Sequence, residues 1–284
     1  MQQFNYRGMP FMSGAYLDKN LSVKQGEFTY YDYNGNKKKS GTFERNNANG
    51  VWKYYSKQGA VVAEGNYEDD YRNGEWQLFS DNAKIKEKVK YISGKYEGKL
   101  LRWHNDTLIE KGQYKSNIKV GFWQGWHENG SRDYEGNFIN GKRDGEWKFY
   151  FPSNKVSAIE QYKNGEVIQV DWFNEKGESI TPTDPLEYDP IYPGEPRALA
   201  EFLMNNVNYP EIARRFNHQG IIYVGFIIAT DGSITDVKIR KGVSLELDEE
   251  AMRVIKMMPK WTPAMSHGRT ISMVYTLPIH FRLG

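Results

Sequence analysis

The chain has 284 residues, and its 20 Tyr outnumber both its 13 Leu and its 12 Ala. This composition argues against a helix bundle or coiled coil, and together with 27 Gly it favours strands and tight turns. The 38 basic and 36 acidic residues nearly cancel, which argues against a nucleic-acid partner. The absence of Cys excludes disulfides, thiolate zinc sites and cysteine nucleophiles.

Gly and Trp are concentrated early in the chain, because 20 of the 27 Gly and 7 of the 8 Trp precede residue 178. We therefore predict a repeat domain over residues 1–178, a Pro-rich acidic linker over 179–196 and a second domain over 197–284. The linker is either a semi-rigid spacer or an ordered strap along one domain. Its defining residues are Pro182, Pro185, Pro190, Pro193 and Pro196, with Asp184, Glu187, Asp189 and Glu195.

Three columns of residues recur in the first domain with a period of about 24. In the first column a small residue is followed two places later by an aromatic residue, as at Gly14, Gly41, Gly65, Gly112 and Gly136. The second column consists of Gly26, Gly50, Gly74, Gly98, Gly121 and Gly145, and Trp52, Trp76, Trp123 and Trp147 each stand two places after one of them. The third column contains turn residues such as Asn34-Gly35, Gln58-Gly59, Asp81-Asn82, Asn105-Asp106 and Ser153-Asn154.

Each unit, such as GNFINGKRDGEWKFYFPSN, has two short runs with alternating aromatic residues and intervening turns, which is typical of a β-hairpin. A single hairpin cannot bury its own face. We therefore expect about six and a half hairpins to stack side by side into an elongated, single-layer antiparallel sheet. The Trp and Tyr columns are interpreted as packing residues, and a functional surface is expected on the face that bears the variable residues.

The strings NGEWQLF, DGEWKFY and GNFINGKRDGEW resemble MORN repeats, in the degenerate variant found in bacterial proteins. The resemblance covers roughly residues 12–177. It implies a scaffold for protein or lipid contacts rather than an enzyme.

From Arg197 onward the pattern is that of a small α+β domain. A helix is predicted over RALAEFLMNNV and a short helical turn after Tyr209-Pro210. The run GIIYVGFIIA is predicted to be a central strand, with Asp231-Gly232 as a two-residue hairpin turn and 233–242 as the return strand. The inward residues of the two helical segments are expected to be Leu199, Phe202, Leu203, Val207, Ile212, Ala213 and Phe216.

A third helix is predicted over LDEEAMRVIKMM, stopped by Pro259. The last strand alternates, and the helical crossover makes it parallel to the second strand. If it lies on the far side of the first strand, all neighbouring strands are antiparallel. The predicted three-stranded antiparallel sheet therefore has the order second, first, third strand. The expected inward residues are Ala251, Val254, Ile255 and Met258 from the helix and Ile271, Met273, Tyr275, Leu277, Ile279 and Phe281 from the last strand.

The blocks NYPEIARR, QGIIYVGFIIATDGSITDVKI, LDEEAMRVIKMMPKWTP and YTLPIHFRL resemble the carboxy-terminal domain of the TonB energy transducers, in the form typical of Bacteroidetes-like bacteria. The resemblance covers residues 197–283. It implies a periplasmic or cell-envelope protein that grips an extended segment, the TonB box, of outer-membrane receptors and is coupled to an inner-membrane motor complex. The opening MQQFNYRGMPFMSG lacks an apolar signal core, so a signal or anchor would have to lie upstream.

Pro278 predicts that the last strand lies at an edge of the sheet, because proline has no N–H to donate. An exposed edge is a template for an added strand, whose backbone hydrogen bonds provide affinity. The predicted docking residues for the receptor peptide are Ser272, Met273, Val274, Tyr275 and Thr276. The alternative is that the linker, or a second copy of the chain in a homodimer, covers this edge.

The five His lack metal-ligand spacing, and no Walker motif or nucleophile elbow is present. We therefore expect no enzyme activity, no cofactor and no metal site. Two functions are consistent with the sequence. One is a TonB-like component of energy-coupled transport, and the alternative is a MORN-repeat interaction scaffold whose terminal domain mediates self-association.

Overall fold

The computed structural model describes residues 2–4, 8, 10–80, 82–182, 186–194 and 196–283. Asp81 of the third column, and Asp184, Pro185 and Glu195 of the Pro-rich segment, lie outside the described residues. The chain forms two compact units, Met1–Ser179 and Ile180–Gly284. The three-part division into 1–178, 179–196 and 197–284 stays a prediction.

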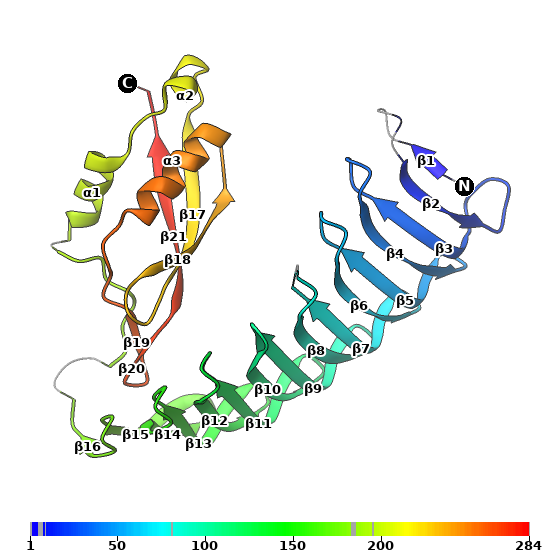
Figure 1. Cartoon of the computed structure of the whole chain (residues 1–284). Coiled ribbons are helices and arrows are strands. Elements are labelled where there is room, and N and C mark those ends of the chain that lie inside the picture. Colours follow the sequence, from blue (N-terminus) through cyan, green and yellow to red (C-terminus); the bar gives the residue numbers. More distant parts are fainter. Residues whose placement is uncertain are drawn as a thin grey trace. The chain divides into compact units, whose positions relative to one another are not determined.

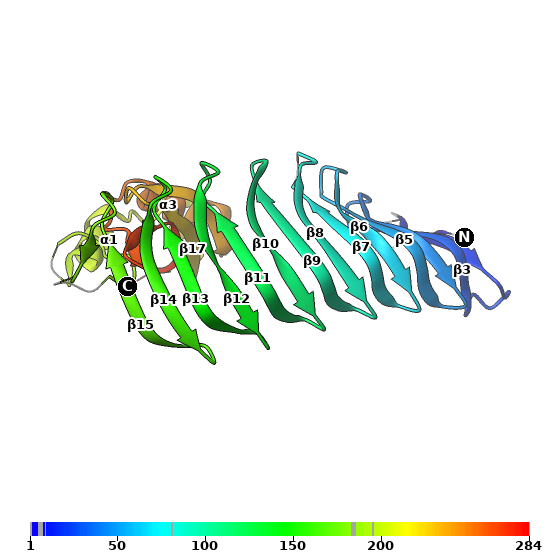
Figure 2. The ribbon, with the colours of Figure 1, turned by 90° about the horizontal axis from the view of Figure 1, so that it is seen from below.

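The first unit contains a single sheet in which every strand pairs with its neighbours in chain order. Figures 1 and 2 show these strands side by side in one curved and twisted layer, which confirms the predicted sheet of repeated hairpins. The strands are β1 (Gln2–Phe4), β2 (Pro10–Tyr16), β3 (Lys24–Tyr31), β4 (Lys37–Glu44), β5 (Asn47–Tyr55), β6 (Val61–Glu68), β7 (Tyr71–Phe79), β8 (Ile85–Ile92), β9 (Lys95–His104), β10 (Thr107–Lys115), β11 (Ile118–Trp126), β12 (Arg132–Ile139), β13 (Lys142–Tyr150), β14 (Val156–Lys163), β15 (Glu166–Phe173) and β16 (Ser179–Ile180).

The packing of this sheet depends on the first column of glycines. Gly65 lies beneath the ring of Trp76, and a Cβ atom at Gly65 would lie 2.2 Å from the indole Cδ2. The same relation joins Gly41 to Trp52 and Gly136 to Trp147. Each indole packs over a glycine of the preceding strand. Trp52, Trp76, Trp123 and Trp147 are therefore 0–2% exposed, although the described residues of the first unit form no second layer over them.

Buried and half-buried rings form a continuous aromatic ladder across the sheet. Each of the strands β2 to β14 contributes one ring, and successive ring centroids are 4.8 to 6.2 Å apart, mostly in edge-to-face geometry. The interpretation of the Trp and Tyr columns as packing residues is therefore confirmed. The rings belong to Tyr16, Phe28, Phe43, Trp52, Tyr67, Trp76, Tyr91, Tyr96, Tyr114, Trp123, Phe138, Trp147 and Tyr162.

The second column of glycines has a different role. Gly74 has φ +75 inside β7, and a Cβ atom there would meet no atom within 4 Å. Backbone conformation rather than space therefore requires glycine at this position. The tight connections between hairpins are two-residue turns such as Asp69-Asp70, in which both residues have positive φ.

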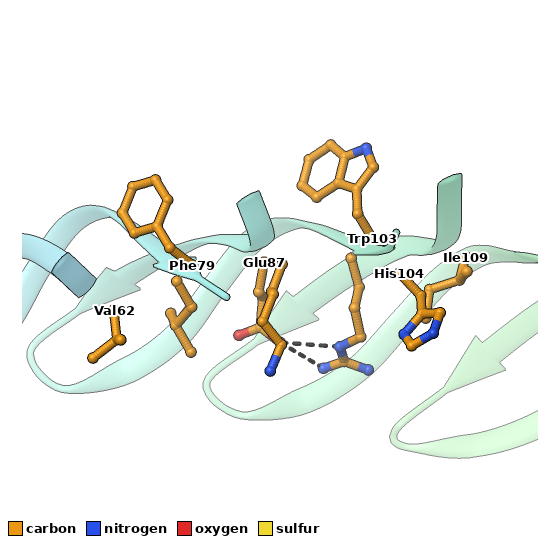
Figure 3. Close-up of a pocket in the computed structure, with 9 residues that line it drawn as sticks. Val62, Phe79, Glu87, Trp103, His104 and Ile109 are labelled. Carbon is orange, nitrogen blue, oxygen red and sulfur yellow. Dashed lines mark hydrogen bonds and ion pairs between the residues drawn. The ribbon is translucent and has the colours of Figure 1, made fainter. Parts of the chain in front are cut away.

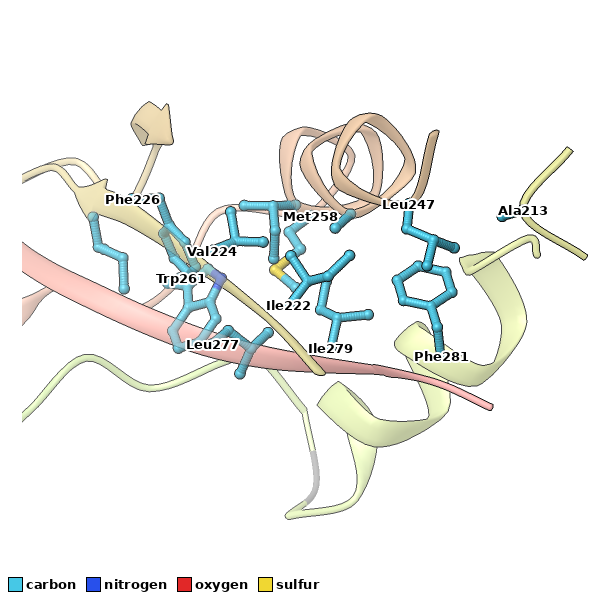
Figure 4. Packing of buried hydrophobic residues seen from close by; sticks show 13 residues of the cluster. Ala213, Ile222, Val224, Phe226, Leu247, Met258, Trp261, Leu277, Ile279 and Phe281 are labelled. Atoms are coloured by element: carbon cyan, nitrogen blue, oxygen red, sulfur yellow. The ribbon is translucent and has the colours of Figure 1, made fainter. Parts of the chain in front are cut away.

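The described part of the second unit contains three helices and two small sheets. The larger sheet has the order β18-β17-β21 with antiparallel neighbours, as predicted, and Figure 4 shows how its side chains pack against α3. The elements are α1 (Ala198–Asn206), α2 (Glu211–Arg215), β17 (Gly220–Ile228), β18 (Ile234–Lys241), α3 (Leu245–Lys256), β19 (Ala264–Ser266), β20 (Arg269–Ile271) and β21 (Met273–Phe281).

The core of this unit follows the predicted pattern of α3. Leu247, Ala251, Val254 and Ile255 are fully buried, and most of them pack against the inner residues of β17 and β21. In Figure 4, Leu247 points toward Phe281, and Met258 points toward Ile222. Within the described residues no helix is long and apolar enough to cross a membrane.

The prediction for the short helix α2 was partly wrong. Ala213 is buried, but Ile212 is 55% and Phe216 is 66% exposed. A five-residue helix can turn only one side to the core, and the neighbouring Tyr209 fills the remaining space with its ring edge-on to Phe281, 5.6 Å between centroids.

Two connections also differ from the prediction. The turn at Asp231-Gly232 is longer than two residues, because Ala229 N–H donates to Ser233 C=O and Gly232 N–H donates to Ala229 C=O. The last predicted strand is interrupted at Ser272, so that Ile271 belongs to β20, which pairs with β19. The reason is that residues 264–271 form their own small hairpin before the chain enters the main sheet.

Candidate functional site

The candidate site is the outer edge of β21. Within the described residues β21 pairs with β17 only, so its other side carries backbone groups without a strand partner. Met273, Val274, Tyr275 and Thr276 of the predicted docking segment lie at the start of β21, whereas Ser272 lies just before it.

Pro278 fixes the direction of these backbone groups. It lies opposite Tyr223 in a register that runs without a break from Gly220 and Phe281 to Ile228 and Met273. A proline fits into an unbroken ladder only where its nitrogen faces away from the partner strand. Because this direction alternates along an antiparallel strand, Val274 and Thr276 also turn their N–H and C=O groups to the open side.

The side chains of the segment alternate between solvent and core. Val274 is 60% exposed and Thr276 is exposed, while Met273 and Tyr275 are half-buried. The Tyr275 ring lies 5.2 Å from the Trp261 ring and 5.8 Å from the Phe226 ring, measured between centroids. The docking segment is therefore supported from beneath by an aromatic cluster.

Trp261 is held in place by the turn between β17 and β18. The backbone N–H of Trp261 donates to the carbonyl of Gly232 at 2.9 Å, and a Cβ atom at Gly232 would lie 2.0 Å from the Trp261 carbonyl oxygen. Nearby, Lys260 pairs with Asp231 at 2.7 Å. Hydrogen bonds from Lys260 and Ser233 hold the pKa of the Asp231 carboxyl well below its usual range.

Part of the Pro-rich segment also supports the site. Tyr188 and Ile191 form single antiparallel bridges with Met265 and Thr262, and the Tyr192 ring stands edge-on to Trp261 at 5.3 Å. These residues therefore lie along the second unit as a strap. Their described bridges go to residues 262–265 and leave the outer side of β21 without a paired strand.

The opposite edge of the sheet is a poorer template for an added strand. The pairing of β18 with β17 is interrupted twice, and Asp236 has a positive φ of 51° within the strand. Lys238, Arg240 and Lys241 add charge. Bulges and charged residues are the usual means by which sheet edges are protected from pairing, so β21 is the open edge of this domain.

The first unit has a hollow of about 520 Å³ at the ends of strands β6 to β10. Glu87 and Arg102 are among the residues that line it, and Figure 3 shows Glu87 there. The Arg102 guanidinium donates to Glu87 at 2.8 and 3.0 Å and also contacts Glu110, which receives further hydrogen bonds from Lys119 and Tyr134. Since these charges are paired with one another, the cluster is a structural one.

The same cluster affects the ionisation of Tyr134. Burial, followed by the negative charge of Glu110, raises the pKa of the Tyr134 phenol well above its ordinary value. Tyr134 therefore remains a hydrogen-bond donor to Glu110 at 2.8 Å at any physiological pH.

The sequence indicated the edge strand but not the residues that support it. Trp261 is the only Trp after residue 178, and Asp231-Gly232 is a strong turn signal. Both could have indicated a structural centre, but nothing in the local pattern shows that the Gly232 turn meets Trp261, 29 residues later.

Family comparisons agree with this architecture. Residues 205–283 match the family model for the Gram-negative bacterial TonB protein C-terminal, and residues 48–69 and 143–164 match the MORN repeat variant. The chain thus combines MORN repeats with a TonB C-terminal domain in the predicted order. No curated protein matches this chain.

Solved structures similar to part of the chain include two solution structures of the Helicobacter pylori TonB-CTD. The first is 24% identical, with coverage of 30% of this chain and 78% of that chain and a TM-score of 0.25. The second is 25% identical, with coverage of 30% and 88% and a TM-score of 0.24.

Proposed function

We propose that this protein is a non-enzymatic, TonB-like component of the cell envelope that binds an extended peptide by adding it as a strand to the open edge of β21. The peptide would be the TonB box of an outer-membrane receptor, and the binding would support energy-coupled transport. The match of residues 205–283 to the TonB C-terminal family supports this assignment. An envelope or periplasmic location follows from the same match.

The unpaired outer side of β21 is the observation that carries the proposal. Val274 and Thr276 offer two donors and two acceptors to an added strand, and Pro278 ends this donor row. The exposed side chains of the same residues are available to select a partner peptide. Backbone pairing would provide affinity, and side chains in alternation would provide specificity.

The test measures the affinity of the full chain for a synthetic peptide with the TonB box of a receptor from the same organism. Val274→Pro removes one outward N–H, and we expect a loss of affinity of about tenfold or more, because a peptide carbonyl then lacks its donor. Val274→Thr retains the N–H and should bind within about twofold of the unchanged chain. Thermal unfolding verifies that both variants fold.

A second arm changes only the peptide. N-methylation at alternate residues of the peptide removes the donors on one side of the added strand, and the shifted methylation pattern removes those on the other side. One pattern should abolish binding and the other should preserve it. Equal affinity for both peptides, or unchanged affinity of Val274→Pro, would overturn strand addition at β21.

A further inference from the structure

The first unit carries a second row of rings outside the aromatic ladder. One aromatic residue stands five places after each glycine of the second column, on every other strand from β3 to β13. All six side chains are half-buried. We call this row the aromatic stripe; it consists of Tyr31, Tyr55, Phe79, Trp103, Trp126 and Tyr150.

The aromatic stripe lies on the face opposite to the ladder. Five of its six rings come three residues after a ladder ring, as Phe79 does after Trp76, and Trp103 comes three residues after the buried Leu100. Successive residues of a strand alternate between faces. Figure 3 shows Phe79 and Trp103 on one side of the ribbon and Glu87 on the other.

Apolar residues continue the row on the strands that follow Tyr55, Phe79 and Trp103, whereas Lys37 lies opposite Tyr31 and Arg132 opposite Trp126. The register places Tyr55 opposite Val61, Phe79 opposite Ile85 and Trp103 opposite Leu108. Within the described part of the first unit no helix or second sheet covers this row. From Tyr55 to Trp126 the row is therefore an apolar track that runs across the strands.

The spacing of the rings corresponds to one kind of ligand. Neighbouring strands lie about 4.7–4.9 Å apart, so rings on every second strand repeat about every 9.4–9.8 Å. A polyproline II helix has three residues per turn and a rise of 3.1 Å, so it presents the same side about every 9.3 Å. Aromatic rings at this spacing are suited to receive prolines from successive turns.

The charges beside the track indicate the charge of the ligand. Lys88 and Lys111 lie in the row next to the aromatic stripe on the same face, and within the described residues neither has a carboxylate partner. The Lys111 Nζ lies 5.3 Å from the centroid of the Trp126 ring. A neighbouring hollow of about 170 Å³ is lined by Lys88, Lys90 and Lys99 with a single acidic residue, Glu75.

We propose that the aromatic stripe between Phe79 and Trp126 binds a proline-rich, acidic segment of a partner protein in the polyproline II conformation. Prolines of successive turns pack against Phe79, Trp103 and Trp126. The carboxylates of the segment pair with Lys88 and Lys111. This proposal concerns the first unit and does not depend on peptide binding at β21.

The test uses calorimetry on the full chain with the twelve-residue peptide (Pro-Pro-Glu)4. Its three-residue period places all carboxylates on one side of the polyproline II helix. Trp103→Ala should lower the affinity at least tenfold, as expected for a central aromatic contact. Tyr71→Ala, which removes a ring that is 60% exposed but outside the stripe, should remain within about twofold.

Controls separate this proposal from the other ligands that such a face could bind. Lys88→Glu leaves every ring in place and should also weaken (Pro-Pro-Glu)4 at least tenfold, even if Trp103→Ala were to fold poorly. If the flexible peptide (Gly-Ser-Glu)4 bound as tightly as (Pro-Pro-Glu)4, the affinity would come from the carboxylates alone, and the proposal would be overturned. Binding of chitohexaose without binding of (Pro-Pro-Glu)4 would make the stripe a glycan site and would equally overturn it.

Discussion

At the scale of single residues, the two glycine columns are required for different physical reasons. Gly65 has an ordinary backbone conformation and lies under the Trp76 ring, whereas Gly74 has open space around it and a positive φ. The sequence shows both columns with the same period. It cannot distinguish them, because close approach and backbone conformation both appear simply as glycine.

This difference predicts that the two positions respond differently to asparagine, although alanine is destabilising at both. Gly65→Ala forces the Trp76 ring from its place and should lower the free energy of unfolding by about 1–3 kcal/mol. Gly74→Ala should lower it by about 1–2 kcal/mol through the left-handed backbone alone. Asparagine tolerates that conformation, so Gly74→Asn should be less destabilising than Gly74→Ala, whereas Gly65→Asn should be no better than Gly65→Ala.

Denaturant unfolding followed by Trp fluorescence measures these differences, because seven of the eight Trp belong to the first unit. If asparagine were equally tolerated at Gly65 and Gly74, the assignment of the two columns would be incorrect.

A carboxylate in the second unit predicts a pH dependence. Glu250 accepts a hydrogen bond from the backbone N–H of Asn208 at 2.7 Å and pairs with Arg253. Burial alone would raise the pKa of Glu250, but the hydrogen bonds from Arg253 and Asn208 outweigh burial and lower it below its ordinary value of 4.5. A carboxyl with a lowered pKa stabilises the folded state above its unfolded pKa, and this contribution is lost as the pH falls through the folded pKa.

We therefore expect the midpoint of thermal unfolding of the second unit to fall between about pH 5 and pH 3, and to fall less steeply in Glu250→Gln. Scanning calorimetry of the full chain at several pH values measures this slope. Glu249→Gln, at an exposed neighbouring position, is the matched control and should retain the slope of the unchanged chain. Identical slopes for Glu250→Gln and the unchanged chain would contradict the assignment.

At the scale of elements, one hairpin shows how a pair of medium-sized side chains replaces the usual pair of glycine and Trp. Where other units pair glycine with Trp, strands β8 and β9 pair Val89 with Leu100, and both residues are buried. Val89 stands at the position of the glycine and Leu100 at the position of the Trp, so two side chains of medium size fill the space of a small and a large one. The array remains continuous through this unit because Tyr91 and Tyr96 maintain the ring contact at 4.8 Å.

The exchange predicts strong coupling between the two positions. Leu100→Trp alone overfills the unit and Val89→Gly alone leaves a cavity, so each should be destabilising by about 1–3 kcal/mol. Together they restore the usual pair, and the double variant should be more stable than the sum of the two effects by at least about 1 kcal/mol.

Denaturant unfolding of the four proteins in this cycle gives the coupling energy. Val89→Gly with Leu101→Trp is the control, because Leu101 faces the other side of the sheet and should show no coupling. If the changes in the free energy of unfolding for Val89→Gly and Leu100→Trp were simply additive, the indole introduced by Leu100→Trp would not lie over residue 89.

The sequence predicted those elements well whose residue pattern repeats over a long stretch. It predicted poorly the features that depend on contacts between distant residues. The hairpin array, the sheet order β18-β17-β21 and the edge position of β21 follow from spacing, turn residues and Pro278. The exposure of Phe216 and the interruption at Ser272 do not. They depend on Tyr209 filling the core and on the small hairpin at residues 264–271. Both features arise from tertiary packing, and no local sequence pattern indicates them.

At the scale of the whole molecule, each unit carries a different kind of candidate binding surface: a sheet face in the first unit and a sheet edge in the second. The first unit is a single sheet whose two faces differ, with the buried ladder on one and the aromatic stripe on the other. The second unit is a small α+β domain with one protected and one open sheet edge. The composition that marks the first unit, rich in Gly and aromatic residues, thus describes a scaffold, and the open edge is in the unit that lacks this bias.

The central claim is that an extended peptide pairs with the open edge of β21. Amide hydrogen exchange of the full chain, resolved by NMR with and without the TonB-box peptide, tests it most directly. The outward amides of Val274 and Thr276 should exchange much more slowly in the presence of peptide, while the amide of Tyr275, which faces β17, should change little. Unchanged exchange at Val274 and Thr276, or new protection along β18 instead, would contradict the claim.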